Sequence, residues 1–295
     1  MKPDLEAMAR TLENSGSYRV LRKLVPRRTF NQPDGSALRL GIFLDVETTG
    51  LDPALDEIIE LAMVPFTFNR EGVIFEIGEI FEGLRQPAVS IPAEITALTG
   101  IDDAMVAGQT IDKGEVARFI EPANLILAHN AAFDRRFVER LCDEFALKPW
   151  GCSQSQVPWK EEGFDGTKLN YLLAGVGLFH DAHRALSDCQ AALEILARPL
   201  PKSGRIAFKT LLENARKPLC RVWAERSPIE SKDILKARGY RWNDGTDGRP
   251  KSWWRDVDED RCDAELAFLG SKIYQGDVDI PVQRITAVDR FSDRG

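Results

Sequence analysis

The chain has 295 residues, which is enough for two domains with buried cores. A hydrophobic fraction of 43% and a charged fraction of 29% are typical of a globular protein and exclude a disordered chain. A formal net charge of −7 argues against a protein that coats long duplexes by bulk electrostatics, yet it agrees with an acidic site whose bound cations offset the charge.

Residues 1–35 predict an N-terminal helical arm. Leu5, Met8 and Leu12 recur at helical spacing, which predicts a short amphipathic helix. After a polar break, residues 18–28 combine an apolar stripe with several arginines, and we interpret them as a second, docked helix with a solvated basic face. A basic contact with nucleic acid is the alternative for the same residues.

Residues 36–200 predict the main domain. Apolar runs that predict buried strands are Leu38–Val46, Ile58–Phe68, Val73–Leu84 and Leu125–Ala128. Helices are expected at Ala131–Phe145, Lys168–Ala174 and Arg184–Ala197. Strands and helices that mix in this way are typical of an α/β fold with a covered sheet. The stretch 198–204, rich in proline and glycine, marks the expected domain boundary.

Residues 205–295 predict a small α+β module. Its expected strands are Arg221–Ala224, Tyr240–Trp242, Ser252–Val257 and Val278–Ile285. Its expected helices are Lys232–Arg238 and Glu259–Ile273. Aromatic and basic side chains interleave here, namely Tyr240, Trp242, Trp253 and Trp254 with Arg241, Arg249, Lys251 and Arg255. We interpret the aromatic residues as the core of the module. Stacking on single-stranded bases is the alternative.

The cysteines and the N-terminus bear on the compartment. Five cysteines are scattered and none has CxxC spacing, which indicates reduced thiols rather than disulfides or a zinc site. Residues 1–6 lack the apolar core of a secretory signal. No apolar run approaches the ~20 residues needed to cross a bilayer. We therefore expect a cytoplasmic protein without membrane contact.

The first chemical motif is Asp45-Val46-Glu47-Thr48-Thr49-Gly50. Asp45 and Glu47 stand two apart on a strand, so both carboxylates point to one face. They lie where the strand ends, which is where α/β folds place their sites. Adjacent carboxylates repel unless a cation joins them, and hard oxygen ligands suit Mg²⁺ or Mn²⁺. A solvent-facing acidic turn is the alternative for this pair.

Two further motifs follow downstream. His129-Asn130-Ala131-Ala132-Phe133-Asp134 comes after a short strand; Asn130 is placed to cap the next helix, and Asp134 falls in its first turn. His183-Arg184-Ala185-Leu186-Ser187-Asp188 opens a later helix. Five positions along a continuous helix would separate His183 from Asp188, so we expect His183 on the loop before the helix or in its first turn.

These segments resemble, in order, the three exonuclease motifs of the DEDDh family, which includes the proofreading subunit of bacterial DNA polymerase III, ribonuclease T and oligoribonuclease. The segment 95–101 also looks like a family segment near the nucleotide pocket. The resemblance covers roughly residues 36–200. It implies a ribonuclease H-like fold, a mixed central sheet flanked by helices, and 3′→5′ exonuclease activity.

Carried over to this sequence, the resemblance implies a role for each motif residue. The implied ligands of two Mg²⁺ or Mn²⁺ ions are Asp45, Glu47, Asp134 and Asp188. His183 matches the general base, which suits an imidazole that titrates near neutral pH. The positions that match nucleotide contacts are Thr48, Thr49, Leu51 and Phe133. His129 and His180 are expected to have no catalytic role, because His180 misses the family spacing to Asp188.

The implied reaction releases nucleoside 5′-monophosphates from single-stranded or frayed 3′ ends, with DNA favoured as substrate. An RNA-directed exoribonuclease is an alternative. So is a proofreading or accessory subunit with a DNA polymerase partner, although no clamp-binding segment is evident after residue 200. A non-catalytic nucleic-acid-binding module is the alternative that is not an enzyme. It is disfavoured because all five positions that match the family's catalytic residues carry the matching residue types.

Overall fold

A computed structural model describes residues 4–246, 248–292 and 294. The chain divides into two compact units. The first runs to Asn214 and includes Phe291, and the second holds Ala215–Arg290. This division falls inside helix α8 (Ala207–Arg216). The domain ranges expected from the sequence, 36–200 and 205–295, stay a prediction.

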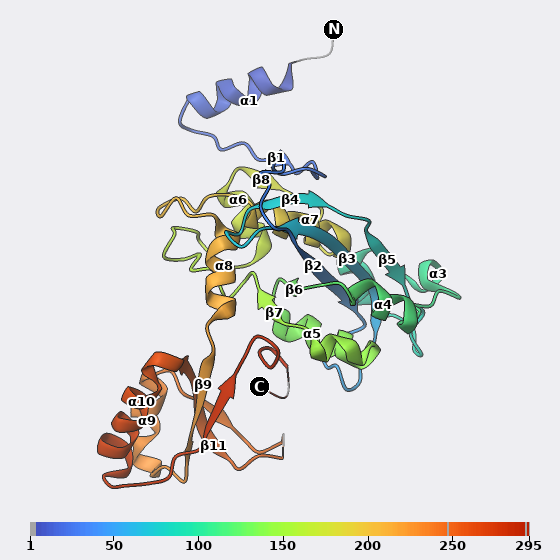
Figure 1. Ribbon diagram of the computed structural model, residues 1–295. Helices are drawn as coiled ribbons and strands as arrows, with labels where there is room; N and C mark the ends of the chain where they lie inside the picture. The colour runs from blue at the N-terminus through green and yellow to red at the C-terminus, as the bar shows by residue number, and fades with distance from the viewer. Residues whose placement is uncertain (1–3, 247, 293, 295) are drawn as a thin grey trace. The chain divides into compact units, whose positions relative to one another are not determined.

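The first unit is built on a six-stranded mixed sheet (Figure 1). Its strands are β2 (Arg39–Thr48), β3 (Ile58–Phe68), β4 (Ile74–Ile77), β5 (Phe81–Leu84), β6 (Leu125–Ala128) and β7 (Trp150–Cys152). They follow the order β4-β3-β2-β6-β7, and β5 also pairs with β3. β2 is central, because it runs antiparallel to β3 on one side and parallel to β6 on the other.

Helices cover this sheet and confirm the expected α/β class. They are α2 (Ala93–Thr99), α3 (Asp103–Val106), α4 (Lys113–Ile120), α5 (Ala131–Leu141), α6 (Leu169–Gly175) and α7 (Ala185–Leu196), with a 3-10 turn at Asp143–Leu147. Ile42, Leu44 and Val46 of β2 share a buried cluster with residues of α4 and α5. α7 packs against β2 and β3. Since strand residues alternate between faces, Asp45 and Glu47 point away from the α4–α5 cluster.

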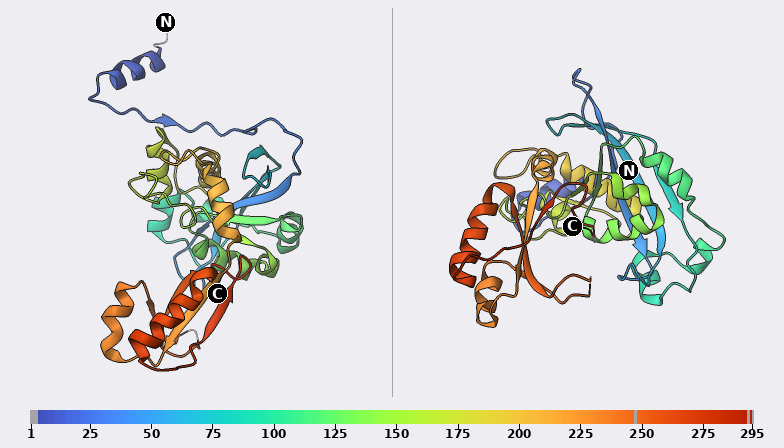
Figure 2. Two further views of the ribbon diagram at one scale, coloured as in Figure 1. Left: turned by 60° about the vertical axis from the view of Figure 1, so that its left-hand side comes forward. Right: turned by 60° about the horizontal axis from the view of Figure 1, so that its bottom comes forward.

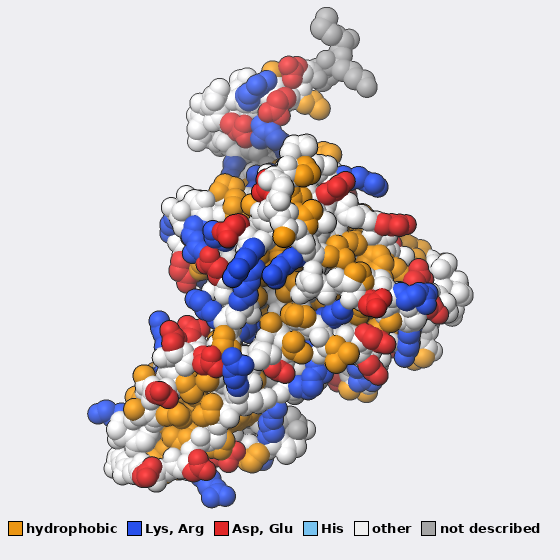
Figure 3. Space-filling model, viewed as in Figure 1, with side chains coloured by type: hydrophobic (Ala, Val, Ile, Leu, Met, Phe, Trp, Pro, Cys, Tyr) orange, Lys and Arg blue, Asp and Glu red, His pale blue; other side chains and the backbone are white. Residues whose placement is uncertain are grey.

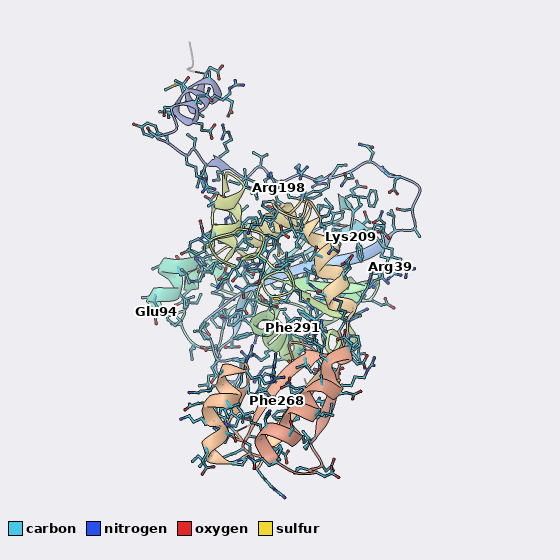
Figure 4. The ribbon with its side chains drawn as sticks, turned by 90° about the vertical axis from the view of Figure 1, so that its left-hand side faces the viewer. Arg39, Glu94, Arg198, Lys209, Phe268 and Phe291 are labelled. Atoms are coloured by element: carbon cyan, nitrogen blue, oxygen red, sulfur yellow. The ribbon has the colours of Figure 1, made fainter. Side chains whose placement is uncertain are left out.

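The start of β2 is marked by Arg39 in Figure 4. Arg39, at the start of the strand, and Glu94, on α2, lie on opposite sides of the first unit. A smaller buried cluster joins the region around α2 to β3 through Ile59, Ile91 and Ile101. This cluster packs residues of α2 and α3 against β3, the strand that pairs with β2.

The N-terminal arm is only partly as expected. The first helix, α1 (Leu5–Asn14), is confirmed, and Asp4 caps it by accepting from the N–H of Ala7 at 3.0 Å. The expected helix over 18–28 is wrong. This stretch contains the short strand β1 (Arg22–Lys23), which pairs in parallel with β8 (Leu178–Phe179). The backbone N–H groups of 22 and 24 find acceptors in Gly177 and Phe179 at 2.9 and 2.8 Å, so the segment satisfies its backbone without a helix.

The basic side chains of this arm are also engaged. Arg22 binds Glu6 at 2.8 Å and Glu13 at 3.0 Å. Arg27 binds the buried Glu194 at 2.9 Å. Carboxylates of the chain itself therefore bind two of the arginines that the alternative interpretation assigns to nucleic-acid contact.

The strand expected over 73–84 is divided in two. β4 and β5 both pair antiparallel with β3, and the break between them follows Ile77. Gly78 donates its N–H to Pro65 at 2.8 Å, which keeps the interrupted backbone bonded. A turn that includes Glu71 joins β3 to β4. Gly72 has a φ of 76°, and a Cβ there would lie 2.6 Å from the Lys209 backbone, so only glycine fits.

The second unit is a small α+β module, as expected (Figures 1 and 2). Its antiparallel sheet has the order β10-β11-β9-β12. The strands are β9 (Leu219–Glu225), β10 (Arg241–Asn243), β11 (Ser252–Asp258) and β12 (Val282–Ile285). The helices are α9 (Lys232–Ala237) and α10 (Cys262–Phe268), with 3-10 turns at Ile229–Ser231 and Glu259–Arg261 and a π-helix at Leu269–Tyr274. Both α-helices lie on one side of the sheet (Figure 2).

The tryptophans of this unit divide between core and surface. Tyr240 and Trp253 belong to its buried cluster, as the core interpretation predicts. Trp242 does not, because it is 53% exposed. Within the described chain, no helix is long and apolar enough to span a membrane.

Candidate active site

The end of β2 brings two carboxylates to one face of the sheet. In the antiparallel pairing of β2 with β3, Asp45 lies opposite Ala62 and Glu47 lies opposite Glu60. β6 pairs with β2 only as far as Phe43, so the backbone beyond that point is open on its other side. A register shift follows between Glu47 and Thr48. The carboxyl end of β2 thus carries acidic side chains beyond its last pairing with β6, as expected for a strand-end site.

Asp134 enters this opening from the first turn of α5. The N–H of Val46 donates to its Oδ1 at 3.3 Å. The residue is 1% exposed, and its Oδ2 has no hydrogen-bond partner among the described residues. Burial raises the pKa of Asp134 to about 8. An orphaned carboxylate oxygen in such a place is an expected position for a metal ligand.

Asn130 precedes α5 but does not cap it as predicted. It occupies the N-cap position with a φ of 78°, and its side chain makes no capping hydrogen bond. The left-handed backbone explains this difference, because it turns the side chain away from the helix amides. Asparagine tolerates that conformation better than most residues. Its contribution is therefore the sharp turn from β6 into α5.

Asp188 is placed by α7, whose N-terminus is anchored by Glu60. This buried carboxylate accepts from the side chain of Arg184 at 2.7 Å and from the N–H of Ala185 at 2.9 Å. Glu60 is only 4% exposed and pairs in register with Glu47. The ion pair therefore fixes the start of α7 against the strand beside the acidic pair. Sequence reasoning missed Glu60, since a single carboxylate within an apolar strand gives no motif.

His183 lies on the loop before α7, as the spacing predicts. Its φ of 64° is left-handed, and its N–H donates to Asp188 Oδ2 at 3.1 Å. One ligand atom each from Glu47, His183 and Asp188 lies within 4.8 Å of the others. The His183 residue is exposed, so its imidazole stands at the rim of the acidic cluster.

His180 contacts the same carboxylate, which the sequence did not indicate. Its Nε2 lies 2.5 Å from Asp188 Oδ1, and its side chain is 3% exposed. Its Nδ1 has no partner among the described residues. Both oxygens of Asp188 are thereby held, one by a ring nitrogen and one by the N–H of His183. The pairing of β8 with β1 supports the loop on which both histidines lie.

The carboxylates repel one another strongly. The pKa of Asp45 is raised well above its ordinary range, first by burial and then by the charges of Asp134 and Asp188. The pKa of Glu47 is raised to about 8, again chiefly by burial and next by Asp188. Four acidic groups at one strand end fit the oxygen-ligand preference of Mg²⁺ and Mn²⁺, and bound cations would relieve their repulsion.

The residues expected to contact a nucleotide differ in their surroundings. Thr48 and Thr49 are 7% and 6% exposed; the Thr48 hydroxyl donates to Gly50 at 2.6 Å, and that of Thr49 lies 3.2 Å from Asp56. Leu51 follows them and is 81% exposed. Phe133, on α5, is partly buried against Phe137 at 4.9 Å between ring centroids. The threonine hydroxyls thus shape the turn, and Leu51 is the residue of this set that is open to solvent.

Both ring nitrogens of His129 have hydrogen-bond partners. Its Nδ1 lies 2.8 Å from Ser153 Oγ, and its Nε2 lies 2.9 Å from the carbonyl of Thr167. Burial lowers its pKa to about 4, so the ring is neutral near pH 7. Both ring nitrogens are engaged away from the acidic cluster.

Comparison with known proteins gives a family match over this unit. A family model described as Exonuclease (RNase_T) matches residues 42–196, a range that contains all the acidic ligand candidates and His183. A PolC-type DNA polymerase III of Caldanaerobacter subterraneus subsp. tengcongensis is 30% identical over 179 residues, which is 58% of this chain and 12% of that protein. The 3′-5′ exonuclease DinG of Bacillus subtilis is 33% identical over 191 residues, 59% of this chain and 19% of that protein.

The DNA polymerase III subunit epsilon of Aquifex aeolicus is 30% identical over 166 residues, 54% of this chain and 79% of that subunit. The chain thus spans a small part of the first two relatives and most of the third. Among solved structures, a zinc-bound complex of E. coli exonuclease I with single-stranded DNA aligns with a TM-score of 0.52 and 19% identity, covering 76% of this chain and 63% of that chain. At this identity the likeness supports the fold, which is consistent with the ribonuclease H-like class.

Proposed function

Because this chain belongs to the RNase_T exonuclease family, we propose that it is a 3′→5′ exonuclease that releases nucleoside 5′-monophosphates from nucleic-acid 3′ ends. The observation that carries the proposal is the convergence of Glu47, His183 and Asp188 beside the orphaned oxygen of Asp134. A structural acidic cluster would pair its carboxylates with cationic side chains. The pKa values of Asp45, Glu47 and Asp134 are instead raised, chiefly by burial.

The metal ligands in this proposal are Asp45, Glu47, Asp134 and Asp188. Two bound Mg²⁺ or Mn²⁺ ions would supply an activated water and stabilise the charge that develops on the scissile phosphate. The chain supplies the positioning. Val46 orients Asp134, while Glu60 fixes the start of the helix that carries Asp188.

His183 is the proposed general base. It lies on an exposed loop at the rim of the acidic cluster, where its imidazole can take a proton from a water at the scissile phosphate. Its left-handed backbone and the hydrogen bond to Asp188 hold the loop in place. The ring is therefore positioned without being buried, so that it can release the proton to solvent.

The nucleotide contacts in this proposal come from the turn after β2. The turn backbone and hydroxyls of Thr48 and Thr49 lie next to Glu47, and the exposed Leu51 is placed to wedge beside a terminal base. Phe133 contributes its partly buried ring to the wall of the same region.

DNA is the proposed substrate, with single-stranded or frayed 3′ ends as the favoured form. Support comes from relatives named as DNA polymerase III proteins and from the structural neighbour that was solved with single-stranded DNA. The same names make a DNA polymerase the proposed macromolecular partner. RNA is the competing substrate. The choice between the two depends on whether the site accepts the 2′-hydroxyl of a ribonucleotide.

A labelled-substrate assay tests this function. The protein is incubated with Mg²⁺ or Mn²⁺ and with single- and double-stranded DNA and RNA labelled at the 5′ or 3′ end. We expect a ladder that shortens from the 3′ end, mononucleotide 5′-phosphates as product, and complete loss of activity with EDTA. Glu47→Gln should be inactive, and Glu121→Gln, an exposed carboxylate outside the cluster, should behave as wild type. Equal activity in Glu47→Gln and wild type would refute the assignment.

A further inference from the structure

The second unit contains a pocket that is separate from the acidic cluster. It has a volume of about 560 Å³ and is lined by the turn after β9, by α9 and by the β10–β11 pair. Its wall is mainly apolar, with Ile229, Trp242 and Trp253, and its polar rim includes Lys232 and Lys236. This size is within the range of pockets that hold small organic groups. Hydrophobic side chains also gather at the surface of this unit (Figure 3).

Trp242 is the unusual residue of this wall. It faces Trp253 in the β10–β11 register, with ring centroids 5.4 Å apart. Trp253 is 8% exposed and belongs to the core, whereas Trp242 is 53% exposed. A buried tryptophan thus supports a second one whose remaining surface is open to solvent. A large aromatic ring fixed in this way is a ready platform for stacking.

The charge of the rim is positive. Lys232 and Lys236 are four residues apart on α9, so their side chains share one face of the helix. Neither has an ion pair among the described residues. Glu230, in the 3-10 turn before α9, and Asp233, on α9, are exposed and do not line the pocket. The lysines are therefore available to anionic groups of a ligand.

Two carboxylates of the same unit are engaged by arginines. Asp256 binds Arg221 at 2.7 Å, and Glu265 binds Arg238 at 2.8 Å. Arg255, one of the arginines that the sequence sets beside the tryptophans, also binds Glu265, at 3.3 Å. The cations that line this pocket are lysines that the aromatic pattern did not include.

From the exposed ring, the apolar wall and the lysine rim, we propose that this pocket binds an unpaired base of single-stranded nucleic acid, with adjacent phosphates on Lys232 and Lys236. A stacked base needs an aromatic face and few hydrogen bonds, which this wall provides. A duplex keeps its bases inside and could not offer one. The inference rests on the proposed function for the class of ligand, and it concerns binding by the second unit alone.

The test is equilibrium binding by the full chain in EDTA, where hydrolysis is off. The probe is a 5′-fluorescent dT₂₀ strand followed by anisotropy at low salt, with a blunt duplex of equal length as comparison. Trp242→Ala should weaken binding of the single strand by about 5- to 100-fold, as expected for the loss of one stacked base. Trp242→Phe should recover most of the affinity, and binding of the duplex should not change.

Two controls make the result specific. Tyr171, on α6 of the first unit, is 54% exposed and matches Trp242 as a surface aromatic residue, so Tyr171→Ala should bind as wild type. The double variant Lys232→Ala/Lys236→Ala should reduce the slope of log affinity against log salt by about 1.4, for two phosphates on a single strand. Lys272→Ala, an exposed lysine outside the pocket, should leave the slope unchanged.

Wild-type affinity in Trp242→Ala, with thermal unfolding unchanged, would overturn the proposal and leave another occupant, such as a peptide, for the pocket. Equal losses for single strand and duplex would overturn it as well. If Trp242→Ala does not fold, Trp242→Phe and the lysine variants decide. A chain without nuclease activity that still shows Trp242-dependent binding would refute the proposed function alone. An active exonuclease with Trp242-independent binding would refute the pocket alone.

Discussion

Replacing Asp134 by asparagine should stabilise the metal-free protein while abolishing its activity. Asp134 is 1% exposed and has one oxygen without a partner. Burial raises its pKa from 3.8 to about 8. At neutral pH the folded chain therefore favours the protonated form of this carboxyl group, whereas in the unfolded chain the group is ionised. Asparagine keeps an oxygen to accept from Val46 and removes the charge.

The size of the effect follows from the same values. At pH 7 the unfolded chain has Asp134 ionised, whereas the folded chain must protonate it, and this destabilises the fold by about 4 kcal/mol, at about 1.4 kcal/mol for each pH unit above its ordinary pKa. The new amide leaves a buried N–H₂ without a partner, which costs about 1–3 kcal/mol. The net gain is then about 1–3 kcal/mol. For a unit of this size, Tm should rise by roughly 2–10 °C.

The pH dependence has a definite sign. A carboxyl group whose pKa is higher in the folded state stabilises the fold below its ordinary pKa, and that contribution is lost as pH rises through the folded value. For Asp134 the window runs from about pH 4 to about pH 8. Glu47, whose pKa is also raised to about 8, acts in the same direction. Wild-type Tm in EDTA should therefore fall across this range, and Asp134→Asn should fall less.

Thermal unfolding between pH 5 and pH 8.5, in EDTA and then with Mn²⁺, measures both effects. Mn²⁺ should raise the Tm of the wild type and should have little effect on Asp134→Asn. Asp143→Asn changes an exposed carboxylate just after α5 and should follow the wild type in both conditions. A lower Tm for Asp134→Asn than for wild type at pH 8 in EDTA would refute the reasoning from the orphaned oxygen.

Three other substitutions test how the site is assembled. His183→Ala should lower the single-turnover rate by about 10²- to 10⁴-fold and leave Mn²⁺ affinity near wild type, and an unchanged rate would exclude it as the base. His180→Ala should weaken Mn²⁺ binding by about 10- to 100-fold in calorimetry, because Asp188 loses the ring that orients it, and equal affinity would exclude that positioning role. Arg184→Ala leaves Glu60 buried without its cation and should lower the free energy of unfolding by roughly 1–3 kcal/mol in urea titrations; no change would show that Ala185 suffices.

The sequence identified much of the fold because its strongest patterns are local. The continuous apolar runs of β3 and β6 need no partner to be recognised, and the observed bounds, Ile58–Phe68 and Leu125–Ala128, are those expected. The helix predicted for residues 18–28 was wrong for the opposite reason. Their apolar stripe has helical spacing, but their backbone pairs with β8, which lies more than a hundred residues further along the chain. The break between β4 and β5 likewise depends on pairing with β3.

At the site, too, some features of the acidic pair Asp45 and Glu47 follow from local sequence and others depend on distant segments. Spacing along a strand determined that both carboxylates share a face, and the motif order predicted which later residues join them. Only the tertiary structure decided how they are held. Glu60 anchors α7, His180 contacts Asp188, and Trp242 stays exposed while Trp253 is buried. The physical reason is that periodicity and motif spacing are local properties of a chain, whereas burial and hydrogen-bond partners depend on segments that meet only when it folds.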